Sequence, residues 1–311
     1  MSYAPLLDEL RGLRWPARRR VPGVLPGAHP ARLRGPGGEF SEYRAYRQGD
    51  DPRRLDWRLL ARSDRAYVRL ADDHALLPTV CVVDASLSMA YPDAETVRGD
   101  AGRLRAPQVR TKWQAACALA VGLAGVAHAA GDPVGLVVGG RAGDGRDMPR
   151  VLAPRSRRGV VLELARALDA TTPAAAGGLA ALMARVPGGV GTRVVLIGDF
   201  LDDDPGAARR AAAAHVAGGG EVYAVHVVAA EEVEPPPGLR VAVDPEDARV
   251  RRAMDAGARA EYAARFAEWR LELARAWRGA GAAYALVRTD EPAGRVVRRV
   301  VQGATGDGAA A

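Results

Sequence analysis

The residues best suited to chemistry in this chain are an aspartate and two serines, each two positions from the next. Asp84 ends the apolar segment Thr79–Asp84, and Ser86 and Ser88 follow it. Three short oxygen side chains at this spacing can converge on one hard cation. A carboxylate with two hydroxyls suits Mg²⁺ or Mn²⁺, which keep bound waters and leave a coordination position open. The pattern indicates metal-dependent protein binding more readily than catalysis.

A second aspartate occupies the same kind of position later in the chain. Asp199 follows an apolar run that we expect to form a strand at Arg193–Ile197, and the acidic run 202–204 comes shortly after it. If the two strands are parallel, Asp84 and Asp199 reach the same edge of the sheet. The acidic run itself indicates solvated loop residues and the cap of a following helix.

Apolar strand-like runs alternate with helical patterns over residues 79–290, as in α/β domains. We expect strands at Thr79–Asp84, Pro133–Val138, Arg193–Ile197, Glu221–Val228 and Ala283–Val287, with a short edge strand at Leu239–Val243. We expect helices at Gln108–Ala129, Arg158–Leu168, Gly178–Val186, Pro205–Val216 and Ala248–Arg278. Continuous apolar strands between helices predict a doubly wound, mainly parallel sheet that is covered on both faces. In such sheets ligands bind beyond the carboxyl ends of the strands.

Two further segments flank this domain. Residues 1–78 are rich in Arg, Pro and Gly, and we expect them to form an N-terminal extension packed on the α/β domain. Residues 291–311 are expected to form a C-terminal tail whose end, Gly303–Ala311, is disordered. The predicted organisation is therefore an extension, one α/β domain at 79–290, and a tail.

The extension contains a short helical pattern with its own polar contacts. Asp50 or Asp51 is expected to cap a helix that has Pro52 at its first position. Asp56 stands at near-helical spacing from neighbouring arginines and is expected to form ion pairs with them. Trp57 is expected to anchor this helix on the α/β domain. The segment is interpreted either as a packing clamp or as a partner-binding surface near the metal edge, and the two are compatible.

The charge of the chain leaves a nucleic-acid function open. The formal net charge is +7, and Lys112 is the only lysine among 44 basic residues. This Arg-rich bias can arise from a GC-rich genome, but the basic arm Arg11–Arg20 could also contact DNA, RNA or an acidic partner. The sequence has no aromatic-stacking motif or known nucleic-acid fold signature to support the first two.

The expected cellular compartment of the protein follows from the lack of targeting signals in the sequence. No apolar stretch reaches the roughly 18 residues of a membrane span, and the N-terminus lacks the pattern of a signal peptide. We therefore expect a cytoplasmic protein. Cys81 and Cys117 agree with this, because they are expected to be buried free thiols.

The aspartate–serine loop and Asp199 together resemble the metal-ion-dependent adhesion site of the von Willebrand factor A fold. The resemblance implies the metal ligands Asp84, Ser86, Ser88, Asp199 and Thr172. Thr171 is the alternative to Thr172, because the family's Gly-Gly-Thr is replaced here by Gly177-Gly178-Leu179. The implied cofactor is Mg²⁺ or Mn²⁺, with an acidic side chain of a partner completing the metal shell.

An upstream pattern resembles the bacterial family known as domain of unknown function 58, whose members carry it before a von Willebrand A-like domain. The pattern comprises Gly35–Phe40, Arg44–Trp57, Ala61-Arg62 and Tyr67–Arg69. The resemblance implies a non-enzymatic adaptor that works with a MoxR-type AAA+ ATPase in chaperone-like assembly or remodelling. The same resemblance implies that the aspartates at the strand ends, Asp84 and Asp199, serve to bind a protein partner.

Two alternatives of other classes stay open. A metal-dependent phosphoester hydrolase would need a base, and the sequence offers none that is well placed. The haloacid dehalogenase type is disfavoured, because Ser86 stands where its second aspartate should be. A nucleic-acid-associated factor would act through the basic N-terminal arm and would bind in a strongly salt-dependent way.

Overall fold

The computed structural model of the chain describes most of its length. The described residues are 2–19, 26–30, 39–48, 52, 55–63, 65–72, 74–92, 110–142, 149–174, 178–187, 189, 191–201, 204–237, 239–243 and 249–306. Residues 50 and 51, the expected caps of a helix in the extension, lie outside the described residues.

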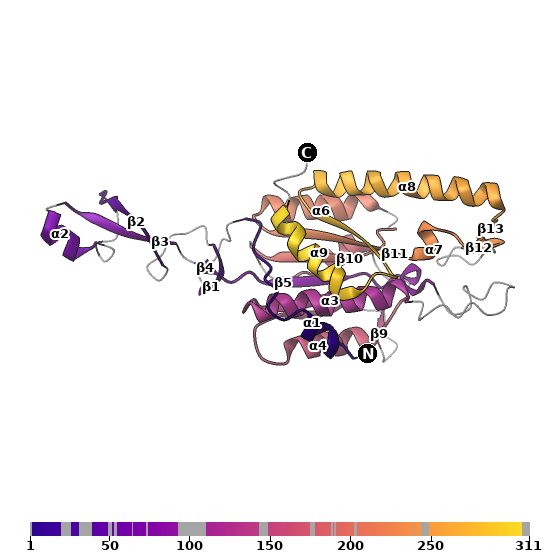
Figure 1. Cartoon of the computed structure of the whole chain (residues 1–311), viewed down its shortest axis with the longest axis horizontal. Helices are drawn as coiled ribbons and strands as arrows, with labels where there is room; N and C mark the ends of the chain where they lie inside the picture. Colours follow the sequence, from indigo (N-terminus) through magenta and orange to yellow (C-terminus); the bar gives the residue numbers. More distant parts are fainter. Residues whose placement is uncertain are drawn as a thin grey trace.

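A six-stranded sheet forms the centre of the molecule (Figure 1). Its spatial order is β14 (Ala283–Arg288), β11 (Glu221–Val228), β10 (Arg193–Gly198), β5 (Thr79–Val83), β6 (Val134–Val138) and β8 (Arg150–Arg155). All neighbours are parallel except β8, which pairs antiparallel with β6 at one edge. Numbered in chain order, this is the 3-2-1-4-5-6 arrangement of doubly wound folds. The expected mainly parallel α/β domain of von Willebrand factor A type is confirmed.

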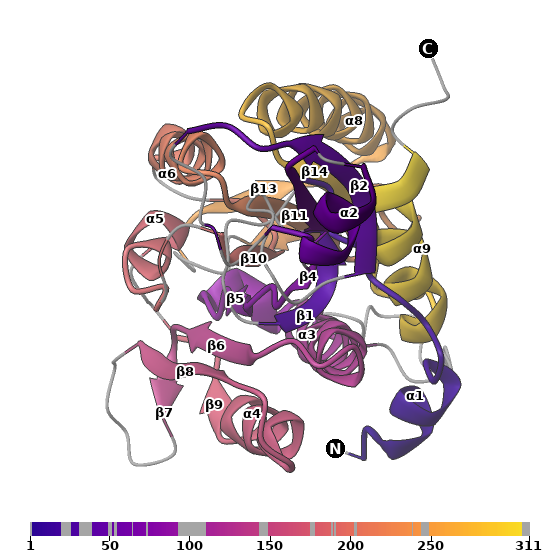
Figure 2. The ribbon, with the colours of Figure 1, turned by 90° about the vertical axis from the view of Figure 1, so that its left-hand side faces the viewer.

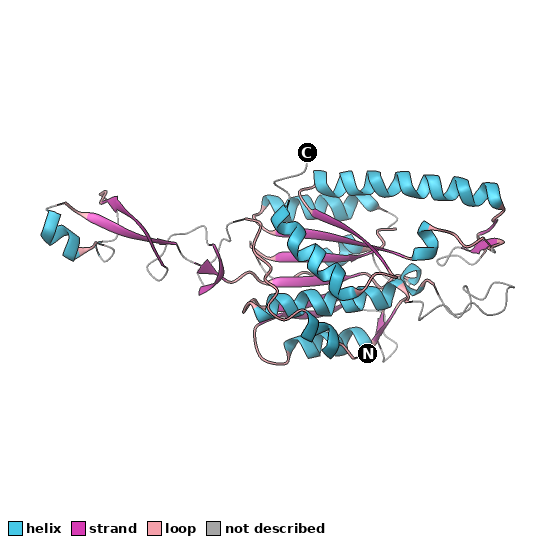
Figure 3. Ribbon diagram, viewed as in Figure 1, coloured by secondary structure: helices cyan, strands magenta, loops and turns pink. Residues whose placement is uncertain are grey.

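Helices cover both faces of the sheet (Figures 2 and 3). The central strands are buried because their alternate side chains enter two separate cores. Cys81 and Val83 of β5 belong to the core under α3 (Lys112–Ala129), whereas Val80 and Val82 belong to the opposite core. The first core also receives α4 (Val160–Asp169), and the second receives α5 (Leu179–Met183), α6 (Pro205–Ala217) and α8 (Ala256–Gly279). Cys81 and Cys117 are free and buried, as expected.

Two parts of the crossover from β11 to β14 differ from expectation. The expected helix Ala248–Arg278 begins only at Ala256, where Asp255 caps it by accepting a hydrogen bond from the Ala258 N–H. The expected edge strand Leu239–Val243 does not join the main sheet. Its part Val241–Val243 (β12) pairs antiparallel with β13 (Arg251–Ala253) in a separate two-stranded sheet. The short helix α7 (Ala230–Val233) precedes this pair.

The C-terminal boundary also needs correction. The predicted tail at 291–311 contains helix α9 (Ala293–Gly306), which lies beside α3 in Figure 2. Val296, Val297 and Val301 of this helix are completely buried in the core under α3. The α/β domain therefore continues past residue 290, because these valines recur at helical spacing and need a covered face.

The first part of the N-terminal extension packs on the domain, as expected. Helix α1 (Ala4–Glu9) contacts α3 and α9, and Trp15 is buried against Tyr223. Further along, β1 (Pro26–Pro30) pairs with β4 (His74–Ala75). His29 of β1 is buried, and its Nε2 lies 2.8 Å from an Asp132 carboxylate oxygen.

The second part of the extension projects away from the amino ends of the strands (Figure 1). It consists of β2 (Glu39–Ala45), α2 (Trp57–Ser63) and β3 (Tyr67–Asp72), with β2 and β3 antiparallel. The expected anchoring of this helix by Trp57 is wrong, because 62% of Trp57 is exposed. Asp56 accepts hydrogen bonds from the backbone N–H groups of Arg58 and Leu59, so the helix begins after Asp56 and not at Pro52. This projecting unit lies at the opposite end of the sheet from the carboxyl ends of β5 and β10, so the expectation that it lies near the predicted metal site is wrong.

None of the helices in the described part of the chain combines the length and the apolar composition that crossing a membrane requires.

Candidate functional site

The two aspartates selected from the sequence meet where the order of the sheet reverses. β5 and β10 are adjacent parallel strands, and the Asp84 N–H donates to the Ile197 carbonyl over 2.8 Å. Gly198 permits this approach, because a Cβ atom there would lie 2.7 Å from the Asp84 Cβ. Asp84 and Asp199 therefore stand side by side at the crevice that binds ligands in doubly wound folds.

The loop after β5 holds its oxygen atoms in a compact chain. The Ser86 N–H donates to one carboxylate oxygen of Asp84 over 2.9 Å, and the Ser86 hydroxyl donates to the other over 3.1 Å. The Ser86 and Ser88 hydroxyl oxygens are 3.0 Å apart. Ser88 lies in a short 3₁₀ turn, Leu87–Ala90, and its side chain also forms a hydrogen bond with the Asp199 carboxylate. Four of the five predicted ligands are thus joined in one set.

The spacing of these oxygens fits the coordination shell of Mg²⁺. Ligands about 2.1 Å from an octahedral ion lie roughly 3 Å from their neighbours. The 3.0 and 3.1 Å separations within Asp84, Ser86 and Ser88 match this value. Among the described residues, no group of three or more His, Cys, Asp or Glu side chains could hold a metal ion. A cation here would therefore depend on the two hydroxyls as well as on carboxylate oxygens.

An ammonium group that the sequence analysis did not connect with the site lies beside Asp199. The Lys112 Nζ donates to Asp199 Oδ2 over 2.7 Å and to Glu232 Oε1 over 2.8 Å. Lys112 is 1% exposed and Asp199 is 2% exposed. The only signal in the sequence was that this lysine is unique in the chain.

The charges of this buried group depend on one another. Burial alone would raise the pKa of Asp199, but the Lys112 ammonium and the hydrogen bonds to Asp199 outweigh burial and lower it. Burial alone would lower the pKa of Lys112, but Asp199 and Glu232 outweigh burial and raise it. Asp199 and Lys112 are therefore both charged near neutral pH.

Neither threonine contributes its hydroxyl to the hydrogen-bonded set. Thr171 is buried, and its hydroxyl donates to the Ala167 carbonyl in the last turn of α4 over 2.9 Å. Thr172 is exposed, and its hydroxyl donates to the Arg141 carbonyl over 3.4 Å. Both belong to β9 (Thr171–Thr172), which pairs with β7 (Arg141–Ala142). The structure thus brings together Asp84, Ser86, Ser88 and Asp199, without Thr172.

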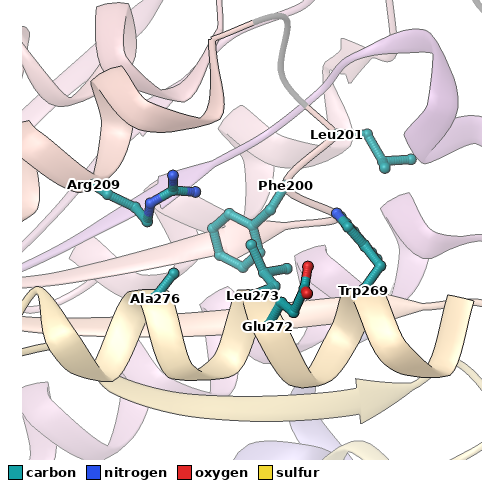
Figure 4. A pocket seen from close by; sticks show the side chains of 7 residues that line it. All are labelled: Phe200, Leu201, Arg209, Trp269, Glu272, Leu273 and Ala276. Carbon is teal, nitrogen blue, oxygen red and sulfur yellow. The ribbon is translucent and has the colours of Figure 1, made fainter. Parts of the chain in front are cut away.

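A groove of about 340 Å³ opens beside the site, between α6 and α8 (Figure 4). Phe200, the residue after Asp199, lines this groove. The backbone φ of Phe200 is 57°. A positive φ is uncommon for a bulky residue and marks backbone strain at this position. The groove is lined by Phe200, Leu201, Arg209, Trp269, Glu272, Leu273 and Ala276. It offers apolar surface with one arginine and one glutamate, next to the strand-end acids.

The fold is an α/β domain of von Willebrand A type, with two aspartates and two serines at the carboxyl edge of its sheet. The chain belongs to the family described as "Protein of unknown function DUF58", whose model matches residues 42–272. Uncharacterized proteins of Mycobacterium tuberculosis and Mycobacterium bovis are each 32% identical over 293 residues. These matches cover 92% of this chain and 85% of each relative.

Solved structures with related folds include three bacterial proteins. A conserved hypothetical protein BatB from Bacteroides thetaiotaomicron is 18% identical, with a TM-score of 0.43 over 74% of this chain and 98% of that one. An aerotolerance-related membrane protein from Bacteroides fragilis is 17% identical, with the same TM-score and coverage. A von Willebrand factor type A protein from Catenulispora acidiphila is 12% identical, with a TM-score of 0.42 over 76% of this chain and 44% of that one.

Proposed function

We propose that this protein is a non-enzymatic, metal-dependent protein-binding adaptor that uses the carboxyl edge of its sheet. Asp84, Ser86 and Ser88 would hold Mg²⁺ or Mn²⁺, with Asp199 joined to them through Ser88. The observation that carries the proposal is the chain of closely spaced oxygens of Asp84, Ser86 and Ser88, 3.1 and 3.0 Å apart, at the topological switch point. The bound ion would supply an open coordination position for an oxygen of the partner.

The side chains around the site support binding more than hydrolysis. General-base catalysis needs a group that can accept a proton near neutral pH. Lys112 is held protonated by its two carboxylates, and His226 is 1% exposed beneath Phe200. A hydrolase would have to recruit its base from elsewhere, so we rank this alternative second.

An acidic protein partner fits the site best. A carboxylate is a hard oxygen ligand that can enter the open position of Mg²⁺. The formal net charge of +7 favours encounter with an acidic surface. The groove between α6 and α8 would receive an apolar side chain next to that carboxylate. The family resemblance makes a MoxR-type AAA+ ATPase the partner to test first. The cytoplasmic location of the protein stays a prediction.

The test is binding of a purified MoxR-type ATPase to immobilised wild-type protein and to Asp84→Ala, in Mg²⁺ and in EDTA. We expect binding in Mg²⁺ that EDTA abolishes, and a loss of at least about tenfold in affinity for Asp84→Ala, which lacks the central ligand. Asp8→Ala is the matched control, because Asp8 is an exposed aspartate on α1 whose side chain forms a surface ion pair with Arg11. Unchanged binding by a folded Asp84→Ala protein would contradict the proposal.

A further inference from the structure

We propose that Lys112 is a built-in counter-cation that keeps the site folded without metal and makes it a weak metal site by itself. This inference rests on the proposed metal-dependent function and concerns the regulation of the same site. It is carried by the buried contacts of Lys112 with Asp199 and Glu232, which lie 87 and 120 residues away in the chain.

The position of the ammonium is fixed by the local structure. Lys112 is the first residue of α3, and Thr111 caps the helix by accepting a hydrogen bond from the Gln114 N–H. The Lys112 N–H donates to the Tyr91 carbonyl over 2.8 Å. The backbone is thus held on both sides of Lys112, and the side chain has one well-defined route to the strand ends.

The contact with Glu232 is fixed from the other side. Glu232 lies in α7, and its second carboxylate oxygen accepts a hydrogen bond from the Ala229 N–H over 2.7 Å. Its side chain is 16% exposed, whereas those of Lys112 and Asp199 are 1% and 3% exposed. Two carboxylates from neighbouring strand ends therefore share one ammonium away from solvent.

This arrangement has a direct consequence for divalent cations. A buried carboxylate without a partner is strongly unfavourable, so Asp199 and Glu232 need a positive charge in the absence of metal. Lys112 supplies that charge. The same charge repels a divalent cation from the Asp199 side of the donor set, so metal affinity is lower than two hydroxyls and two carboxylates would otherwise give.

The charge balance also explains why an acidic partner would bind together with the ion. Asp84, Asp199, Glu232 and Lys112 are three carboxylates and one ammonium, whose formal charges sum to two negative charges. One divalent cation neutralises them, so a carboxylate of the partner meets no excess negative charge from this group. Without the lysine, the group with its ion would be negative and would disfavour that carboxylate.

The experiment compares wild-type protein with Lys112→Met by calorimetric Mn²⁺ titration and by thermal unfolding with and without Mn²⁺. We expect Mn²⁺ to bind Lys112→Met at least about tenfold more tightly, because a charge beside a ligand carboxylate is removed. We expect metal-free Lys112→Met to melt below wild type and saturating Mn²⁺ to raise its Tm by about 5 °C more than it raises that of wild type.

Arg193→Met is the matched control for destabilisation by loss of a buried cation. Arg193 is completely buried at the amino end of the sheet, where its Nε lies 3.2 Å from a Glu221 carboxylate oxygen. This variant should lose stability that Mn²⁺ does not restore. If Lys112→Met does not fold without metal, Lys112→Met/Glu232→Gln removes one of the two unpaired carboxylates and should still bind Mn²⁺ more tightly than wild type.

The outcomes separate this inference from the proposed function. One outcome is that wild type and the folded lysine variants bind Mn²⁺ with equal affinity, whereas Asp84→Ala does not bind it. That result would overturn the role of Lys112 but would leave the metal site standing. No Mn²⁺ binding in any of these proteins would overturn both. Tighter binding in the lysine variant together with Mn²⁺-dependent rescue of its Tm would establish the counter-cation.

Discussion

Lowering the pH should destabilise the protein through His226, which lies in the core beneath the candidate site. His226 is 1% exposed, its Nδ1 lies 2.7 Å from the Tyr284 hydroxyl, and its ring is 5.6 Å from that of Phe200 and 5.4 Å from that of Trp269. Burial in this aromatic surrounding lowers the pKa of His226 from 6.5 to about 3. The folded protein therefore keeps this imidazole neutral in mildly acidic solution.

The size of the effect follows from proton linkage. Because the pKa of the folded state lies below that of the unfolded state, only the unfolded chain takes up the proton between the two values. The contribution of His226 to stability is complete above about pH 6.5 and is lost progressively as the pH falls toward 3. The linkage relation gives a loss of about 2 kcal/mol in the free energy of unfolding between about pH 7 and about pH 5.

The assay is urea unfolding over this pH range in EDTA, for wild type and His226→Asn. The asparagine amide keeps a hydrogen-bonding group near the position of Nδ1 but does not titrate. The variant should be less stable at neutral pH because a buried ring is lost. The stability difference between the two proteins should then shrink by about 2 kcal/mol toward about pH 5. A difference that stays constant with pH would refute the reasoning.

Two further predictions concern the ends of the central strands. Glu221→Gln should lower the free energy of unfolding by about 3 kcal/mol, because Arg193 is left as a buried cation with only neutral acceptors; an unchanged urea midpoint would contradict this. Gly198→Ala should weaken Mn²⁺ binding by about tenfold or more while the circular dichroism spectrum is retained, because the new methyl group would press on the Asp84 side chain; calorimetry with wild-type affinity would count against the proposed ligand role of Asp84.

Much of the fold could be predicted because the central strands are continuous apolar runs. Every residue of β5, β6, β10 and β11 is buried, which is the pattern of a sheet covered on both faces. β8 was missed, because its residues alternate between exposed and half-buried and it contains Pro154, which suits only an edge strand. α9 was missed although its valines recur at helical spacing, because Gly and Arg residues surround them.

The candidate site was predictable where its residues lie in one loop or at equivalent strand ends. Asp84, Ser86 and Ser88 lie in one loop, and Asp199 occupies an equivalent strand end, so local spacing and parallel topology suffice to bring them together. Lys112 could not be connected with them, because its contacts cross 87 and 120 residues and depend on where α3 begins. That start was expected at Gln108, one helical turn too early.

The contact between the two ends of the chain constrains how the protein is made. Glu9, at the end of α1, accepts a hydrogen bond through its carbonyl from the Arg298 guanidinium of α9, 289 residues away. Arg18 reaches Glu221 through its backbone N–H across 203 residues. During synthesis on the ribosome, α1 emerges before α3 and α9, so the surface on which α1 packs is complete only after α9 has been made. A nascent chain that lacks α9 would offer α1 only the α3 part of that surface.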